Sequence, residues 1–258
     1  MKKLFLFAAA ASLLLAGAAS AADMPARYTK APVAPVAVYN WTGFYVGGNA
    51  GYTWSDTNVT YTNAGIVLPI GAAANQNLDG FIGGGQVGYN WQSGKLVFGV
   101  EADAAWRNNR DSTTFNAGID AVTFTTRHTW LATFRPRAGI AANNWLFYVT
   151  GGAAAEGLEH SYFETRTTVP GANRLISSSD TRWGWTVGAG VEAGFGQWSA
   201  GLEYLYVDFD RSTTLSAGPA VLAGVVFGPS SARFDDSAQH VLRAKLNYHF
   251  GGPVVAKY

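Results

Sequence analysis

The chain of 258 residues contains no cysteine, only two methionines and only 14% charged residues. The lack of cysteine excludes disulfide bridges, cysteine-ligated zinc sites and thiol catalysis. The formal net charge is +1, so the basic excess that nucleic-acid-binding proteins usually carry is missing and no nucleic-acid partner is expected. Beyond the N-terminal segment, no apolar run approaches the ~18 residues that a membrane helix needs. This excludes a polytopic helical membrane protein.

The first 21 residues have the parts of a secretory signal peptide. Lys2 and Lys3 supply the positive start, residues 4–17 are apolar, and small residues permit cleavage after Ala21. A membrane-anchoring helix is the alternative, but the apolar run is short and no charged flank follows it. Residues 22–40 are rich in proline and alanine, which predicts an extended periplasmic linker. The sequence therefore predicts export, with a barrel domain at 41–250 and a short tail at 251–258.

Glycine (31), tryptophan (9), tyrosine (12) and phenylalanine (15) are abundant, and eight segments alternate apolar with polar residues. Such alternation is typical of strands whose two faces meet different environments. The expected strands are 41–54, 79–92, 95–108, 127–142, 145–159, 181–196, 198–211 and 237–250. Short turns alternate strictly with long connections, which are expected to be loops at about 55–78, 109–126, 160–180 and 212–236. An even strand count with this alternation predicts an all-β, eight-stranded, antiparallel up-and-down barrel in the outer membrane.

One face of every expected strand is free of charge, and the opposite faces carry ten charged residues. A lipid-facing Arg or Lys at the bilayer midplane costs roughly 2–4 kcal/mol, so the charged faces are expected to point inward. An eight-stranded barrel has an interior that side chains can fill, and buried charges must be paired. We therefore expect a salt-bridge network that plugs the lumen, with a narrow polar path for small solutes as the alternative. The ten residues are Glu101, Asp103, Arg107, Arg135, Arg137, Glu156, Glu192, Glu203, Arg243 and Lys245.

Two features depart from this simple pattern. Pro136 lies within an expected strand and cannot donate to the ladder, so a bulge or a missing hydrogen bond is expected there. Leu205 and Val207 are expected to point inward, which makes the outer end of the lumen less polar.

All nine tryptophans lie near strand ends, as expected for two aromatic girdles at the membrane interfaces. Trp41, Trp91, Trp145 and Trp198 fall at the end with the short turns. The end with the long connections carries Trp54, Trp106, Trp130, Trp183 and Trp185.

Several short patterns resemble catalytic or binding motifs but lack the flanking structure or the spacing that such sites need. Residues 83–88 and 188–193 match the glycine fingerprint of dinucleotide sites, but both continue into strands, so their glycines are expected to allow close packing and curvature. Glu101 and Asp103 could form a catalytic carboxylate pair, and ion pairing in the lumen is the favoured interpretation. The four histidines have no metal-like spacing and are expected at strand ends or interfaces; they are His128, His160, His240 and His249. We expect no enzyme, no cofactor and no metal.

Three segments resemble the outer-membrane immunogenic protein family of alphaproteobacteria, whose members are porin-like eight-stranded barrels. They are Trp41-Thr42-Gly43-Phe44-Tyr45-Val46-Gly47-Gly48, residues 134–139 (FRPRAG) and residues 148–153 (YVTGGA). The resemblance covers the mature chain and implies an abundant surface antigen of the outer membrane. The last strand also looks like a signal for the barrel-assembly machinery, carried by Leu246, Tyr248 and Phe250.

The leading functional hypothesis is a structural, surface-exposed barrel that supports the integrity of the envelope and presents antigenic or adhesive loops. The first alternative is a porin for small solutes, and the second is a binding protein whose loops hold one ligand or host surface. The expected partners are outer-membrane lipid and lipopolysaccharide, the barrel-assembly machinery, and a host surface or small solutes.

Overall fold

The computed structural model describes residues 39–62, 71–117, 120–165, 167, 173–209 and 212–251. All of them belong to one compact unit, residues 37–257. The predicted signal peptide, most of the predicted linker, and the tail after Gly251 lie outside the described residues. Within the described part of the chain, no helix is long and apolar enough to cross a membrane.

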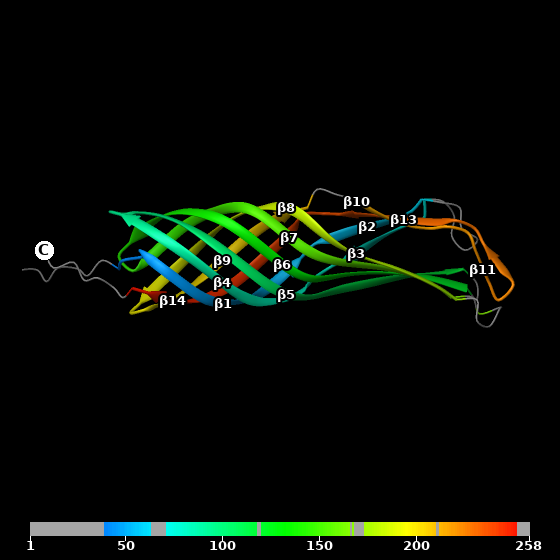
Figure 1. Cartoon of the computed structure of the whole chain (residues 1–258), viewed down its shortest axis with the longest axis horizontal. Helices are drawn as coiled ribbons and strands as arrows, with labels where there is room; N and C mark the ends of the chain where they lie inside the picture. The colour runs from blue at the N-terminus through cyan, green and yellow to red at the C-terminus, as the bar shows by residue number, and fades with distance from the viewer. Residues whose placement is uncertain are drawn as a thin grey trace, which may run out of the picture. The chain divides into compact units, whose positions relative to one another are not determined.

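Eight antiparallel strands close into a barrel in the order β1-β14-β9-β8-β7-β6-β5-β4, as Figure 1 shows. The first and last strands close the ring, with Phe44 opposite Phe250 and Trp54 opposite His240. The predicted fold class is therefore confirmed. The strands are β1 (Gly43–Trp54), β4 (Gly80–Ser93), β5 (Leu96–Ala117), β6 (Asp120–Ala142), β7 (Trp145–Thr165), β8 (Arg174–Phe195), β9 (Trp198–Asp208) and β14 (Gln239–Phe250).

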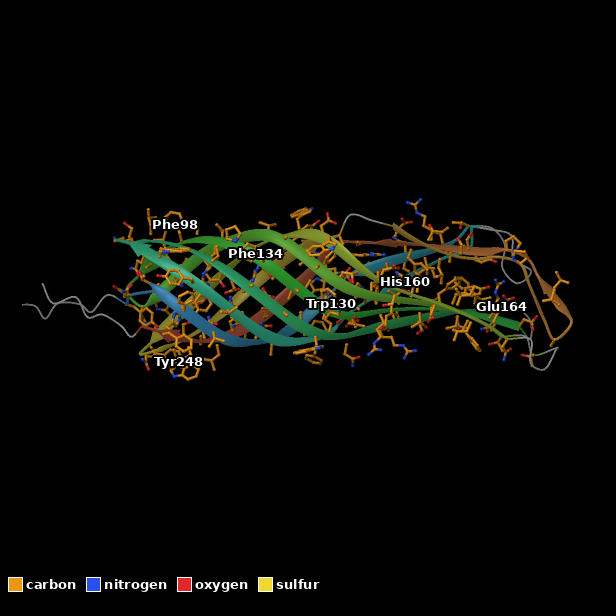
Figure 2. The ribbon with its side chains drawn as sticks, in the orientation of Figure 1. Phe98, Trp130, Phe134, His160, Glu164 and Tyr248 are labelled. Atoms are coloured by element: carbon orange, nitrogen blue, oxygen red, sulfur yellow. The ribbon has the colours of Figure 1, made fainter. Side chains whose placement is uncertain are left out.

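Side chains alternate between the two faces of the barrel wall. Phe98, Phe134 and Tyr248 lie on the outer face, and Phe98 and Phe134 are exposed there (Figure 2). At one end of the barrel, neighbouring strands are joined by two-residue turns. Gly94, Asn143 and Gly196 adopt positive φ angles of 60°, 56° and 62° in these turns. Tight hairpins favour such left-handed residues because their twist matches that of the paired strands.

The described residues of the four long connections are mostly strand, so their prediction as loops was wrong. β5 to β8 continue well past their expected ends, and the β5–β6 ladder reaches Ala117 opposite Asp120. The other two connections contain β2 (Asp56–Tyr61), β3 (Ala73–Asn77), β10 (Ser212–Ala217), β11 (Ala220–Leu222), β12 (Val225–Phe227) and β13 (Ser230–Asp236). Four of these six strands form a sheet in the order β10-β13-β2-β3, and β11 pairs with β12.

The prolonged parts of β5 to β8 and the four-stranded sheet share an apolar core, and together they are called the extension. Phe124 of β6 packs with Tyr162 of β7 and with Phe234 of β13, at ring-centroid distances of 5.3 and 6.3 Å. Val59 of β2 and Leu215 of β10 belong to the same buried cluster. In the extension a cluster of large apolar side chains therefore points inward, whereas most large apolar side chains of the barrel wall point outward.

This change of polarity explains why the prediction failed. The pattern sought in the sequence was an apolar outer face, and in the extension the outer face is polar. The register also shifts by one residue between Trp106 and Asn109 and between His128 and Trp130. A one-residue shift moves alternate side chains to the other face. In β6 the inward positions consequently change from odd numbers, such as Arg135, to even numbers, such as Phe124.

Pro136 interrupts one ladder of β6. It lies opposite Val100 of β5, but the pairing with β7 stops at Phe134 and resumes at Arg137 in the same register. The ladder is thus broken there without a bulge, which is one of the two expected outcomes. The Thr150 hydroxyl donates to the Pro136 carbonyl at 2.9 Å and satisfies that oxygen.

Phe234→Ala should loosen the extension and leave the barrel closed. Phe234 is fully buried, and truncating a buried phenylalanine typically costs about 3–5 kcal/mol. Limited proteolysis in liposomes should show faster cleavage in the extension. The heat-dependent gel shift of the barrel should persist. Arg233→Ala, on the exposed side of the same strand, is the matched control, and equal protection of both variants would contradict the shared core.

Candidate functional site

The ten charged residues predicted for the lumen are all buried, with at most 6% of each residue exposed. They come from β5, β6, β7, β8, β9 and β14, whose inner faces converge on the barrel axis. Each of the ten takes part in at least one ion pair, and the pairs form two groups: a main cluster of eight residues and a smaller group around Glu156.

Arg135 and Arg243 hold the centre of the main cluster. Arg135 Nη2 lies 2.7 Å from Glu101 Oε1 and 2.9 Å from Asp103 Oδ2, and its Nη1 lies 3.2 Å from Glu203 Oε2. Arg243 contacts Asp103 Oδ1 at 2.8 Å and Glu203 Oε2 at 2.7 Å. Two arginines thus bridge three carboxylates that come from two different strands.

Lys245 and Arg137 complete the main cluster toward the end with the short turns. Lys245 Nζ lies 2.7 Å from Glu101 Oε2 and 3.4 Å from Glu203 Oε1. Arg137 Nη1 lies 3.0 Å from Glu192 Oε1. The cluster therefore balances four acids against four bases. Neutrality matters because a buried charge without a partner costs several kcal/mol.

Glu156 organises the smaller group with three partners. Its Oε2 lies 3.2 Å from Arg107 Nη2, 2.9 Å from His128 Nδ1 and 2.8 Å from Gln239 Nε2. Sequence reasoning missed Gln239, and it placed His128 wrongly at a strand end or interface. His128 lies just past the register shift in β6, so counting alternate residues from Arg135 assigns it to the wrong face.

Two tyrosines connect the cluster to the barrel wall, and sequence reasoning missed both. Tyr45 donates to Glu101 Oε2 at 2.7 Å, and Tyr148 donates to Glu203 Oε1 at 2.9 Å. Each ring fills a space that a glycine leaves on the inner wall. A Cβ on Gly88 would overlap the Tyr45 ring, and a Cβ on Gly190 would crowd the Tyr148 ring. Both glycines belong to the fingerprint-like runs, which lie in strands β4 and β8.

The lumen end with the short turns is closed by aromatic rings. Trp41 was predicted in a lipid-facing girdle, but it is fully buried, so that prediction was wrong. Its ring lies 4.6 Å from Tyr39 and 5.7 Å from His249, and its amide donates to Gln92 Oε1 at 2.7 Å. Trp41 precedes the first strand, where the alternation of faces no longer fixes the side-chain direction.

The opposite end of the lumen carries an apolar layer. Leu205 and Val207 point inward and are fully buried, as expected. They cluster with Ile82, Leu131 and Val241 from three other strands.

The apolar layer separates the two groups of ion pairs. Along β5, Ala105 lies between Asp103 and Arg107. Along β14, Val241 lies between Arg243 and Gln239. The main cluster is therefore bordered by apolar or aromatic side chains toward both ends of the barrel, and the smaller group lies beyond the apolar layer.

The other tryptophans of the predicted girdles and the three residues of the predicted assembly signal lie on the outer wall. Seven tryptophans are exposed on the outer wall and Trp130 is half-buried, and Trp106 pairs directly with Trp130 across β5 and β6. The exposed seven are Trp54, Trp91, Trp106, Trp145, Trp183, Trp185 and Trp198. Leu246, Tyr248 and Phe250 of β14 alternate onto the same outer wall.

The remaining histidines divide between the interior and the outer wall. His240 stacks on Trp54 at 5.5 Å near the outer rim, as expected of an interface residue. His249 is buried in the lumen, and His160 is buried in the extension, where it stacks on Phe234 at 4.1 Å (Figure 2). His249 is the penultimate residue of β14, as expected of a strand-end residue, whereas placing His160 at a strand end or interface was wrong.

The fold and its lipid-facing wall define an outer-membrane β-barrel protein. Residues 7–250 match the family model described as "Outer membrane protein beta-barrel domain", and the chain belongs to this family. It is 31% identical to the 31 kDa outer-membrane immunogenic protein of Brucella melitensis, covering 97% of this chain and 100% of that protein. It is also 31% identical to the 22 kDa outer membrane protein of Rhizobium leguminosarum bv. viciae, over 70% and 69% of the two chains. The predicted family and outer-membrane location are confirmed.

Solved structures give a more distant likeness. The outer membrane protein OprG from Pseudomonas aeruginosa is 13% identical with a TM-score of 0.42, covering 83% of this chain and 100% of that one. Neisserial surface protein A is 15% identical with a TM-score of 0.37, covering 81% and 98%.

Arg135→Ala should destabilise the barrel strongly. The change removes one base from a neutral buried cluster and leaves carboxylates undercompensated, which typically costs about 3–5 kcal/mol. Urea unfolding in liposomes, followed by tryptophan fluorescence, measures the loss. Arg127→Ala is the control: its pair with Glu159 is exposed and 3.6 Å long, so a change within about 1 kcal/mol is expected. Similar losses in both variants would contradict a central role for Arg135.

Gly88→Ala tests the space that receives Tyr45. The added methyl overlaps the ring, and overpacking of this kind typically costs about 1–3 kcal/mol. Gly83→Ala in the same strand is the control, because its nearest neighbour would be 3.8 Å away. That variant should be neutral or gain about 0.4–1 kcal/mol through lower chain entropy. The same unfolding assay distinguishes the two, and a neutral Gly88→Ala would show that the ring moves freely.

Proposed function

We propose that this protein is a structural and surface-exposed barrel of the outer membrane whose lumen is plugged by the salt-bridge network. The supporting observation is the burial of all ten lumen charges together with their mutual pairing. In a conducting pore, the charged and polar side chains that line the lumen contact water. Here the charged groups contact one another instead, so the main cluster links β5, β6, β8, β9 and β14 across the lumen.

The layers on both sides of the main cluster support the same proposal. Trp41 and Tyr39 fill one end, and the Leu205 and Val207 layer lies toward the other. An ion that passed through would lose its water against apolar side chains, which is costly. A porin for small solutes is the alternative. It would require the network to open, and breaking buried ion pairs without replacement is strongly unfavourable.

The proposed orientation places the two-residue turns in the periplasm and the extension outside the cell. Short periplasmic turns and longer extracellular connections are the rule for bacterial barrels. In that orientation Leu246, Tyr248 and Phe250 would be read by the barrel-assembly machinery from the lipid-facing side of the last strand. We expect no enzymatic activity, because Glu101 and Asp103 are both held by arginines.

A second function, adhesive contact with another surface, is favoured by apolar side chains exposed on the extension and on the β11–β12 pair. Leu175, Val221 and Val226 are each about two-thirds exposed, at 66%, 67% and 64%. They lie well beyond the tryptophans of the barrel wall along the chain, so lipid does not account for their exposure. In this role the extension and the β11–β12 pair take the place of the long loops that the sequence suggested.

Planar-bilayer recording of the purified protein tests the plug. We expect no stable openings, because moving the network costs more than a modest voltage supplies. The heat-dependent gel shift of the same preparation shows that the inserted protein is folded. Reproducible nanosiemens-scale steps from folded protein would refute the plug and favour the porin.

A further inference from the structure

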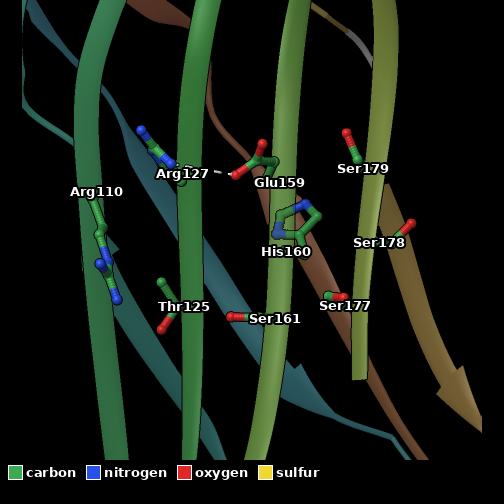
Figure 3. Close-up of a pocket in the computed structure, with 9 residues that line it drawn as sticks. All are labelled: Arg110, Thr125, Arg127, Glu159, His160, Ser161, Ser177, Ser178 and Ser179. Atoms are coloured by element: carbon green, nitrogen blue, oxygen red, sulfur yellow. Dashed lines mark ion pairs between the residues drawn. The ribbon is translucent and has the colours of Figure 1, made fainter. Parts of the chain in front are cut away.

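The outer surface of the extension contains a polar hollow of about 410 Å³ that crosses β5, β6, β7 and β8 (Figure 3). Its residues form two rows across the strands. One row places Arg110 opposite Arg127, Arg127 opposite Glu159, and Glu159 opposite Ser179. The next row consists of hydroxyl side chains, with Thr125 opposite Ser161 and Ser161 opposite Ser177.

The two arginines of this hollow form an unfavourable pair. Like charges directly opposite each other on neighbouring strands are destabilising. Glu159 lies 3.6 Å from Arg127, and both side chains are about half exposed. Among the described residues, no ion pair or hydrogen bond holds the Arg110 guanidinium. The hollow thus has two positive charges against one negative charge, and an anion between the arginines would remove the repulsion.

The residues around the arginines suit an oxygen-rich anion. Arginine donates in a fork that matches phosphate, and serine and threonine hydroxyls bind sugar or phosphate oxygens. Ser161, Ser177 and Ser179 border the hollow together with Thr125. Ser178 is engaged already, since its hydroxyl donates to Asp180 at 2.9 Å.

The distance of the hollow from the membrane narrows the choice of anion. Trp106 and Trp130 are opposite each other in the outer girdle, and Arg110 lies four residues beyond Trp106. At about 3.3 Å per residue this is roughly 13 Å along the strand, or roughly 10 Å along the membrane normal at the usual strand tilt. The headgroup layer of one leaflet is roughly 5–8 Å deep, so the arginines lie just outside it. In the outer leaflet of a Gram-negative cell, the phosphorylated inner sugars of lipopolysaccharide occupy this zone.

We propose that Arg110 and Arg127, with the adjoining serine hydroxyls of β7 and β8, bind the phosphorylated inner sugars of lipopolysaccharide. This inference rests on the orientation in the proposed function, with the extension outside the cell. The proposed site lies on the outer surface of the extension, on the prolonged parts of β5 to β8. The bound glycolipid would hold the extension in a fixed position at the outer surface of the membrane.

Binding of a defined glycolipid to the full mature protein in non-ionic detergent tests the site. The probe is rough lipopolysaccharide truncated to its inner core, and the same material after dephosphorylation is its matched partner. The variant is R110Q/R127Q. The control is R233Q, which removes an exposed arginine on β13, where Arg233 pairs with Asp235 at 2.8 Å. Thermophoresis gives the dissociation constants, and the heat-dependent gel shift verifies folding.

We expect R110Q/R127Q to bind the phosphorylated glycolipid about tenfold more weakly, because charge-assisted hydrogen bonds to phosphate are lost. R233Q should bind as the unmodified protein does, and dephosphorylated glycolipid should not distinguish the three proteins. Equal binding by folded R110Q/R127Q would overturn the assignment. Full competition by millimolar inorganic phosphate would also overturn it, in favour of a soluble anion. Binding in detergent does not depend on the orientation, which proteolysis of the extension on intact cells tests separately.

Discussion

Hydrocarbon around the barrel forbids charge on its outer wall, so every charged side chain of a spanning strand must be satisfied inside. The interior of eight strands leaves little room for water. These two constraints force the acids and bases of β5 to β9 and β14 into mutual contact. The glycine at position 88 and its counterpart Gly190 follow from the same constraint, because bulky neighbours would displace the tyrosines that cap Glu101 and Glu203.

Where the strands leave the membrane, the preferred polarity of the outer face changes from apolar to polar. Water now lies outside, so apolar side chains such as Phe124 and Phe234 turn inward and polar ones such as Thr125 turn outward. The register shifts near Trp106 and Trp130 fall at this boundary. In β6 one extra residue switches which positions point inward. In β5, β7 and β8 the same alternate positions point inward along the whole strand, and there the apolar residues themselves move to the inward positions.

Alternation was enough to find the eight barrel strands and ten buried charges, since lipid imposes a strict period of two. It missed Arg182, which is buried on β8 opposite Glu156. It gave the direction of each side chain but not its depth or its partner. Gln239 was therefore missed, although it lies on the inner face of β14. His128 was misplaced by the register shift, and Trp41 by its position ahead of the first strand. The extension was taken for loops because its apolar residues lie on the face that the barrel pattern treats as polar.

The network also bears on which register the strands adopt. A slip of β6 by one residue would turn Arg135 and Arg137 toward lipid, at roughly 2–4 kcal/mol each near the midplane. It would also separate Arg135 from Glu101, its partner directly across β5. Well-packed apolar residues can equal a buried ion pair in stability, but they would penalise such a slip far less. The lumen charges therefore specify the pairing of strands as well as brace it, and a neutral lumen of equal volume would leave β5 and β6 free to choose between registers.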